Sequence, residues 1–216
     1  LQEWWIEPNN TIPDTLAMEY NWLTLNGKAG PAATPMIVKL GDRVRVRMVN
    51  LGMDHHPMHL HGNQFYVTGT EGGRIPPSAW YPGNTVIVGV AQARDIEFEA
   101  KYAGDWMLHC HLPHHMMNQM VPMVGPNRHL QHGQTKKQIE TNKKVPGYPQ
   151  DMVMIMDEAV AKPDTYGLAP GWTAAMMGMM TMIRVLPPDK YDDMTARIKE
   201  GRVEKPEPAM NQHQHE

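Results

Sequence analysis

Short stretches in which apolar and polar residues alternate fill the first half of the chain. Between residues 43 and 49, Val44, Val46 and Met48 alternate with three arginines, a pattern typical of a strand with one buried and one wet face. A β-branched run at residues 36–38 and the Gly41-Asp42 pair predict a strand and a turn before it. Similar runs follow at residues 64–70, 85–91, 95–100 and 106–111. Many short strands without helical periodicity between them predict an antiparallel β-sandwich or barrel.

The strand expected at residues 95–100 carries the same alternation. Ile96 and Phe98 are expected to face inward, with Glu97 and Glu99 outward. Two further strands are expected at residues 1–8 and 21–27, the second ending in a turn.

The character of the chain changes after about Pro126. A polar, lysine-rich linker runs to Gln150, and a methionine-rich segment follows. Two short amphipathic helices are predicted there from side chains at i, i+3, i+4 and i+7 spacing: Met176, Met179, Met180 and Ile183, then Tyr191, Met194 and Ile198 before Gly201. We therefore expect a strand and linker from an upstream domain at 1–19, a β-domain at 20–126, and a linker with a docking extension at 127–216.

Composition and charge restrict the classes of function that the chain could have. The 216 residues carry a formal net charge of −3, and Lys and Arg are scattered apart from a short lysine cluster at residues 136–144, which argues against a nucleic-acid partner. The longest apolar stretch, residues 172–183, is shorter than the roughly 20 residues of a membrane-spanning helix, so no membrane span is expected. The chain contains one cysteine and 12 histidines. Eight of the histidines fall in the windows 55–61 and 109–115, and the second window also contains the cysteine. Such clustering is typical of metal sites.

The alternation of side chains along a strand explains the histidine spacing in both windows. Successive side chains of a strand point to opposite faces, so Cys110 should face one side while His109 and His111 face the other. By the same parity His59 and His61 share a face, and His56 should point away from them. Two sites on opposite sides of the sheet are implied.

Each side then has its own donor set. A thiolate, two imidazoles and a weak axial thioether form the electron-transfer set of blue-copper sites, and the available donors are His56, Cys110, His115 and Met120. The opposite side offers four imidazoles and no sulfur, which suits copper as an oxygen-binding centre: His59, His61, His109 and His111.

At these residues the sequence resembles the multicopper oxidases. The resemblance rests on H-P-x-H-L-H-G at residues 56–62 and on H-C-H-x-x-x-H-x-x-x-x-M at residues 109–120, in family order, and it covers about residues 20–126. It implies an all-β Greek-key cupredoxin sandwich with a partly helical C-terminal extension. It further implies type 1 copper at His56, Cys110, His115 and Met120, type 2 copper at His59, and the type 3 pair at His61, His109 and His111. Among family members, the chain looks most like laccases and the bacterial copper-resistance oxidases.

The implied activity is the oxidation of a small reducing substrate, a phenol-like compound or Cu(I), coupled to four-electron reduction of O₂ to water. Cys110, His109 and His111 are then the residues that connect the copper sites. The family implies a periplasmic or secreted location. It also builds the trinuclear centre from eight histidines, of which this chain supplies four, so we expect the others from an upstream cupredoxin domain or another subunit.

Several alternatives compete with this interpretation. Many family members carry a carboxylate directly after the last type 1 histidine, where it is thought to help deliver protons. This chain has Met116 at that position, so the sequence does not identify its proton-delivery residue. A blue-copper electron carrier would need only the Cys110 set, and a copper-storage protein would use the methionines. Copper nitrite reductases do not place a histidine on each side of the cysteine. Structural zinc sites are closed sets of four donors, unlike eight donors on two faces. His55 and His114 exceed the motif and are expected to be surface residues or neighbours of ligands.

Overall fold

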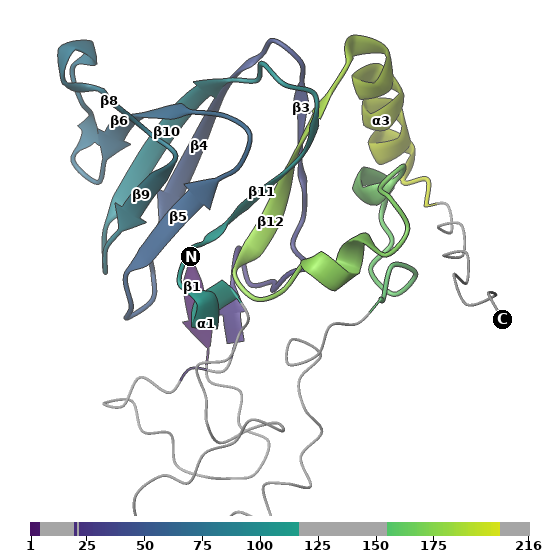
Figure 1. The fold of residues 1–216 in the computed structure, drawn as a ribbon, viewed down its shortest axis with the longest axis horizontal. Coiled ribbons are helices and arrows are strands. Elements are labelled where there is room, and N and C mark those ends of the chain that lie inside the picture. Colours follow the sequence, from purple (N-terminus) through teal and green to yellow (C-terminus); the bar gives the residue numbers. More distant parts are fainter. Residues whose placement is uncertain (5–19, 21, 117–154, 204–216) are drawn as a thin grey trace, which may run out of the picture.

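The computed structural model describes residues 1–4, 20, 22–116 and 155–203, which form a sandwich of two β-sheets (Figure 1). One sheet has the order β4-β10-β6-β7, with β8 also paired to β6, and the other has the order β3-β12-β11-β5-β9. The predicted fold class, an all-β cupredoxin sandwich with a partly helical C-terminal part, is confirmed. Its strands lie close to the predicted runs because the turn residues between those runs end each strand.

The first sheet consists of β4 (Arg43–Val49), β6 (Phe65–Thr70), β7 (Gly73–Arg74), β8 (Tyr81–Gly83) and β10 (Ala93–Glu99). The second consists of β3 (Met36–Lys39), β5 (His56–Leu60), β9 (Thr85–Val88), β11 (Gly104–Cys110) and β12 (Met180–Leu186). A separate pair joins β1 (Gln2–Trp4) to β2 (Trp22–Thr24). The helical elements are η1 (Pro77–Ala79), α1 (Pro113–Met116), η3 (Pro163–Thr165), η4 (Trp172–Ala175) and α3 (Pro188–Glu200).

The main core lies between the sheets. Phe65, Ile96 and Ile183 are fully buried there, and Val44 and Val46 of β4 pack against the same cluster. The arginines between them are exposed, so the predicted alternation of β4 is confirmed.

Glu97 departs from the predicted pattern. It was expected to be exposed like Glu99, yet it is buried. Arg43 contacts its carboxylate at 2.7 Å, Arg74 forms an ion pair with it, and the Thr68 hydroxyl donates a hydrogen bond at 3.0 Å. Alternation predicts which face a side chain occupies, but it does not predict that neighbouring arginines will cover that face.

The predicted helix at residues 176–183 is wrong. Residues 172–175 form one 3-10 turn, and Met180–Leu186 is the strand β12. This strand pairs antiparallel with β11 on one side and parallel with β3 on the other. Every residue of β12 is buried, and a short apolar run buried on both faces has no clear strand periodicity. Hydrogen bonding to two neighbouring strands makes this segment a strand, whereas residue spacing alone indicated a helix.

The second predicted helix is confirmed as α3. It ends at Gly201, whose φ of 64° is the left-handed conformation that glycine adopts readily at a helix C-terminus. In Figure 1, α3 lies beside β3 and β12.

The position of β12 bears on the predicted division of the chain. The boundary at residue 126 falls outside the described residues and stays a prediction, as does an upstream origin for residues 1–19. Strand β12 nevertheless lies between β3 and β11, so part of the expected docking extension is integral to the second sheet. Strand β1 lies near α1, at the same end of the sandwich (Figure 1).

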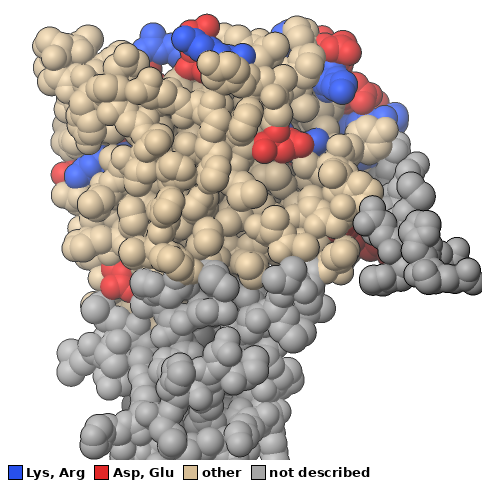
Figure 2. All heavy atoms as spheres, in the orientation of Figure 1, with Lys and Arg blue, Asp and Glu red and all other residues tan. Residues whose placement is uncertain are grey.

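The surface in Figure 2 carries few charged side chains, and most of those visible lie near its margin. Depletion of charge is typical of the central part of protein interfaces. In the described part of the chain, no helix has the length and apolar character needed to cross a membrane.

The ion pairs of Glu97 should make folding stability depend on pH. The hydrogen bond from Arg74, together with those from Thr68 and Arg43, outweighs burial and lowers the pKa of Glu97 from 4.5 to about 2. The stabilisation is therefore complete above pH 4.5 and is lost as the pH falls towards 2. Glu97→Gln should lower the free energy of unfolding at pH 7 by about 1 to 3 kcal/mol and flatten this part of the pH profile. Denaturant unfolding across the pH series measures both effects. Glu99→Gln, at an exposed carboxylate, is the control, and a profile of Glu97→Gln as steep as that of the unsubstituted chain would contradict the assignment.

Candidate metal centre

Three buried side chains meet at the end of the sandwich that holds α1. His56 begins β5, Cys110 ends β11, and His115 lies in α1. Their donor atoms all lie within 4.8 Å of one another, and His56, Cys110 and His115 are almost completely inaccessible to solvent. Strand pairing explains the meeting, because Cys110 lies opposite Met58, two residues along β5 from His56 and on the same face.

The spacing of these donor atoms fits a single metal ion. The Nδ1 atoms of His56 and His115 are 3.1 Å apart, and the Cys110 Sγ lies 3.8 Å and 3.5 Å from them. The circumradius of a triangle with these sides is about 2.0 Å, close to ordinary metal–nitrogen distances. The two imidazoles and the sulfur are therefore placed to share one soft or borderline cation.

The cysteine needs such a cation in order to ionise. Burial raises the pKa of the Cys110 thiol to about 12. A bound metal supplies the positive charge that a buried thiolate requires, which couples metal binding to release of the thiol proton.

Backbone hydrogen bonds from the Met179 peptide hold the loop between Cys110 and His115. The Met179 N–H donates to the His115 carbonyl at 3.1 Å, and the Met179 carbonyl accepts from the Cys110 N–H at 3.0 Å. The preceding residue, Gly178, has a φ of 54°, and a Cβ there would lie 2.3 Å from the His115 carbonyl oxygen. The methionine-rich segment thus fixes the backbone of two donor residues, which its spacing did not predict.

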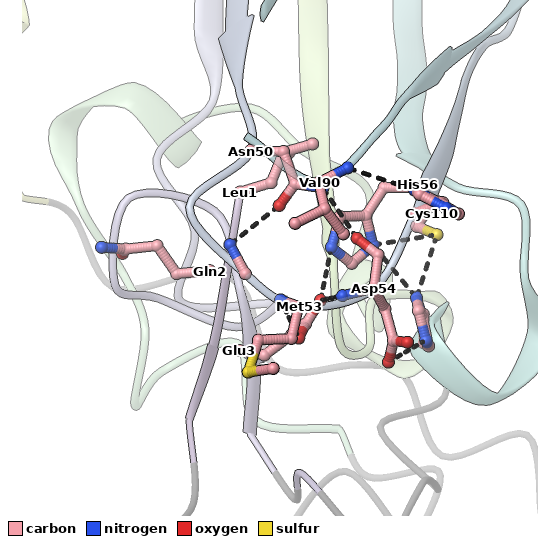
Figure 3. A network of polar contacts seen from close by, with 12 residues as sticks. Leu1, Gln2, Glu3, Asn50, Met53, Asp54, His56, Val90 and Cys110 are labelled. Atoms are coloured by element: carbon pink, nitrogen blue, oxygen red, sulfur yellow. Dashed lines mark hydrogen bonds and ion pairs between the residues drawn. The ribbon is translucent and has the colours of Figure 1, made fainter. Parts of the chain in front are cut away.

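Two carboxylates lie behind the imidazoles (Figure 3). The Glu3 Oε1 contacts the His56 Nε2 at 2.7 Å, and the Asp54 Oδ2 lies 3.7 Å from the His115 Nε2. Burial alone would raise the pKa of Glu3, but its contacts with His56 and with the backbone N–H groups of Met53 and Asp54 outweigh burial and lower it. Sequence reasoning missed both acids, because neither belongs to a histidine motif and Glu3 is distant from both windows.

Four imidazoles gather on the opposite face of the second sheet. His59 and His109 are directly paired across β5 and β11, and ring centroids of neighbouring imidazoles are 4.8 to 5.6 Å apart. The closest approach, 2.9 Å, joins the Nε2 atoms of His61 and His109. His61 and His111 are exposed, so this set is open to solvent on one side.

Polar contacts with groups outside the four-imidazole set orient two of these rings. The His109 Nδ1 lies 2.9 Å from the Cys110 carbonyl, an acceptor, so this nitrogen carries the proton and Nε2 is free to bind a metal. The His59 Nδ1 contacts the Thr85 hydroxyl at 2.7 Å. Burial lowers the pKa of both His59 and His109, and neighbouring histidines lower it further, which favours the neutral, metal-binding form.

The structure therefore brings seven of the eight expected ligand residues into two groups, on the faces that parity predicted. Met120 lies outside the described residues, so its axial position stays a prediction. His55 is exposed and accepts a hydrogen bond from the Val90 N–H at 3.1 Å, as expected of a residue beyond the motif. The His114 side chain also lies outside the described part.

The methionines do not form a single stripe. Met179 packs in the core of the sandwich, whereas Met176, Met180 and Met182 pack in a second cluster with Met107 and Met116. Strand parity separates neighbouring residues of this segment onto two faces.

Comparison with known proteins finds a family model, related sequences and related folds. Residues 6–127 match the sequence model of a family described as multicopper oxidase. The multicopper oxidase MmcO of Mycobacterium tuberculosis is 33% identical over 121 residues, which are 53% of this chain and 22% of that protein. Copper resistance protein A of Escherichia coli is 32% identical over 112 residues, covering 51% of this chain and 18% of that protein. The match thus spans about a fifth of the length of these relatives.

Among solved structures, the blue copper oxidase from Nitrosomonas europaea matches at 29% identity with a TM-score of 0.42. That match covers 45% of this chain and 30% of the other.

The Gly178 contact can be tested by adding one methyl group. Gly178→Ala should lower the free energy of unfolding by more than the roughly 1 to 2 kcal/mol of a left-handed alanine, because its Cβ also meets the His115 carbonyl. Gly201→Ala is the matched control, since Gly201 has a φ of 64° and nothing within 4 Å of its Cβ position. Thermal and denaturant unfolding measure the difference. Equal losses in the two variants would show that the close approach to His115 has no energetic consequence.

Proposed function

The chain belongs to the multicopper oxidase family, and we propose from this premise that it is the C-terminal copper-binding part of such an oxidase. The activity would couple one-electron oxidation of a phenol-like compound or Cu(I) to four-electron reduction of O₂ to water. One observation carries the proposal: Cys110 belongs to the buried donor triad, while its neighbours His109 and His111 belong to the four-imidazole group. Three consecutive residues therefore join two potential metal sites.

The proposed ligand assignment follows the donor chemistry of each group. The buried triad, with Met120 as axial donor, would hold type 1 copper. His59 would bind the type 2 copper, and the type 3 pair would be held by His61, His109 and His111. Bound copper would supply the redox chemistry, namely one-electron transfer at the sulfur site and oxygen reduction at the imidazole site.

Residues of this chain keep the two sites on opposite faces of the sheet and also connect them. Burial of Cys110 would keep water from the metal-bound sulfur, and β11 places the adjacent His109 on the other face. A second link runs from the Cys110 carbonyl to the His109 Nδ1 at 2.9 Å, in parallel with the covalent backbone. The connection is short because it is built within one strand.

The open side of the four-imidazole group supports completion by a partner. Among the residues described, the only group of three His, Cys, Asp or Glu residues with donor atoms within 4.8 Å of one another is the Cys110 triad. A hollow of about 510 Å³ beside the imidazoles is lined by His59, His61 and Asn63. Both polar atoms of the Asn63 side chain are buried without a hydrogen-bond partner in the described structure, although an unpaired buried amide is unfavourable. We propose that an upstream cupredoxin domain or another subunit supplies the missing histidines and covers this hollow.

Location and reductant extend the proposal. Loading of copper outside the cytosol, as the family resemblance implies, would place the protein in the periplasm or among secreted proteins. Similarity to proteins named laccase and copper resistance protein A favours a phenol-like reductant or Cu(I).

A second candidate is a blue-copper electron-transfer protein without oxidase activity of its own. The Cys110 triad favours it, because all three of its donors lie within the described residues, whereas the described part of the imidazole group supplies four of the eight histidines that the family implies. The two candidates differ in oxygen consumption.

Type 1 copper at Cys110 should give the protein its colour. The copper-loaded chain should be blue, and Cys110→Ser should abolish the visible band while copper bound by histidines remains. Absorption spectra and copper content measured on the same samples test both parts. A blue band that persists in Cys110→Ser would refute the assignment.

The isolated chain should bind type 1 copper without acting as an efficient oxidase. Residues 1–216 alone should bind type 1 copper with little oxygen uptake in the presence of a reductant, and addition of the upstream domain should restore uptake. Copper content, paramagnetic signals and oxygen consumption are the measurements. Full four-electron reduction of oxygen by the isolated monomer would disprove the need for a partner.

A further inference from the structure

Glu3 is a fully buried carboxylate supplied by the first strand of the chain. Its Oε1 contacts the His56 Nε2 at 2.7 Å, and both side chains have no exposed surface. The Met53 N–H donates to Oε2 at 2.9 Å, and the Asp54 N–H donates to Oε1 at 3.2 Å. These donors hold both carboxylate oxygens in place (Figure 3).

The backbone around Glu3 leaves it little freedom. Strand β1 pairs with β2, with Glu3 opposite Leu23, and the Leu51 N–H donates to the Leu1 carbonyl at 3.0 Å. A Cβ at Gly52 would lie 2.6 Å from the Glu3 Oε1, so the loop from Leu51 to Asp54 closes tightly around the carboxylate. The contact with His56 is therefore built into the fold from two directions.

This contact favours one nitrogen of His56 as the metal donor. A carboxylate oxygen 2.7 Å from Nε2 favours the tautomer that carries its proton there. The Nδ1 lone pair is then free, and it faces the Cys110 Sγ 3.8 Å away. A carboxylate behind a metal-binding imidazole orients the ring and makes it a stronger donor.

The other imidazole of the triad is held differently. The Asp54 Oδ2 lies 3.7 Å from the His115 Nε2, beyond hydrogen-bond distance. Both acids lie behind imidazoles of the same triad, and the Glu3–His56 distance of 2.7 Å is shorter than the Asp54–His115 distance of 3.7 Å.

We propose that Glu3 is a positioning residue, which fixes His56 as the Nε2–H tautomer, aims its Nδ1 at the metal and raises copper affinity. The proposal rests on the proposed type 1 copper site. A stronger imidazole donor favours Cu(II) over Cu(I), so Glu3 also lowers the reduction potential of the bound copper.

The test uses the full chain with Glu3→Gln, which keeps the size of the side chain and removes its charge. In the metal-free protein, nitrogen chemical shifts of the His56 ring should show the Nε2–H tautomer before substitution and a mixture of tautomers afterwards. In the copper-loaded protein, affinity measured by chelator competition should fall roughly 10- to 100-fold. A redox titration should show a higher potential.

Matched variants separate positioning from folding. Glu97→Gln removes a different buried, ion-paired carboxylate, and it should lower stability without changing the His56 tautomer, copper affinity or potential. Asp54→Asn should change copper affinity less than Glu3→Gln, because its carboxylate is farther from its imidazole. Thermal unfolding of each metal-free variant identifies any loss that comes from destabilisation alone.

The outcomes distinguish this inference from the proposed function. An Nδ1–H tautomer of His56 in the unsubstituted, metal-free chain would overturn the positioning role directly. Unchanged affinity and potential in a folded Glu3→Gln variant would also overturn it, while leaving the copper site intact. Failure of the unsubstituted chain to bind copper at Cys110 would overturn the proposed function and the inference together.

Discussion

The two-residue repeat of a β-strand is the constraint on which both candidate sites depend. Because neighbouring side chains of β11 point to opposite faces, one short segment places Cys110 inside the sandwich and His109 outside it. Strand β5 repeats the arrangement with His56 and His59. Neither site could be moved without changing the other, since pairing of β5 with β11 fixes both in one register.

The same regularity explains how much of the protein could be predicted from sequence. Alternation in β4 and the turn residues between the strands indicated the sandwich, and histidine spacing together with parity indicated which face each donor would occupy. Those inferences are local, because they need only a few consecutive residues. They agree with the structure wherever hydrogen bonding to neighbouring strands supports the local pattern.

What escaped prediction depends on contacts between distant parts of the chain. Glu3 reaches His56 only because β1 folds back against the loop at residues 51–54, and no motif contains it. Met179 holds the Cys110–His115 loop through its peptide group, so its side-chain chemistry gave no indication of that role. The helical spacing of residues 176–183 was misleading for the same reason, since pairing with β3 and β11 outweighs weak local preferences.

The hydrogen bond between the Met179 N–H and the His115 carbonyl also has a consequence for tolerance of change. It joins two residues that lie far apart in the chain, so α1 and the start of β12 are held together at one point of the domain. Substitutions that displace the start of β12 would therefore also displace the backbone of Cys110 and His115. The tolerance of this donor loop to change is thus set by a segment that supplies none of the three donor atoms.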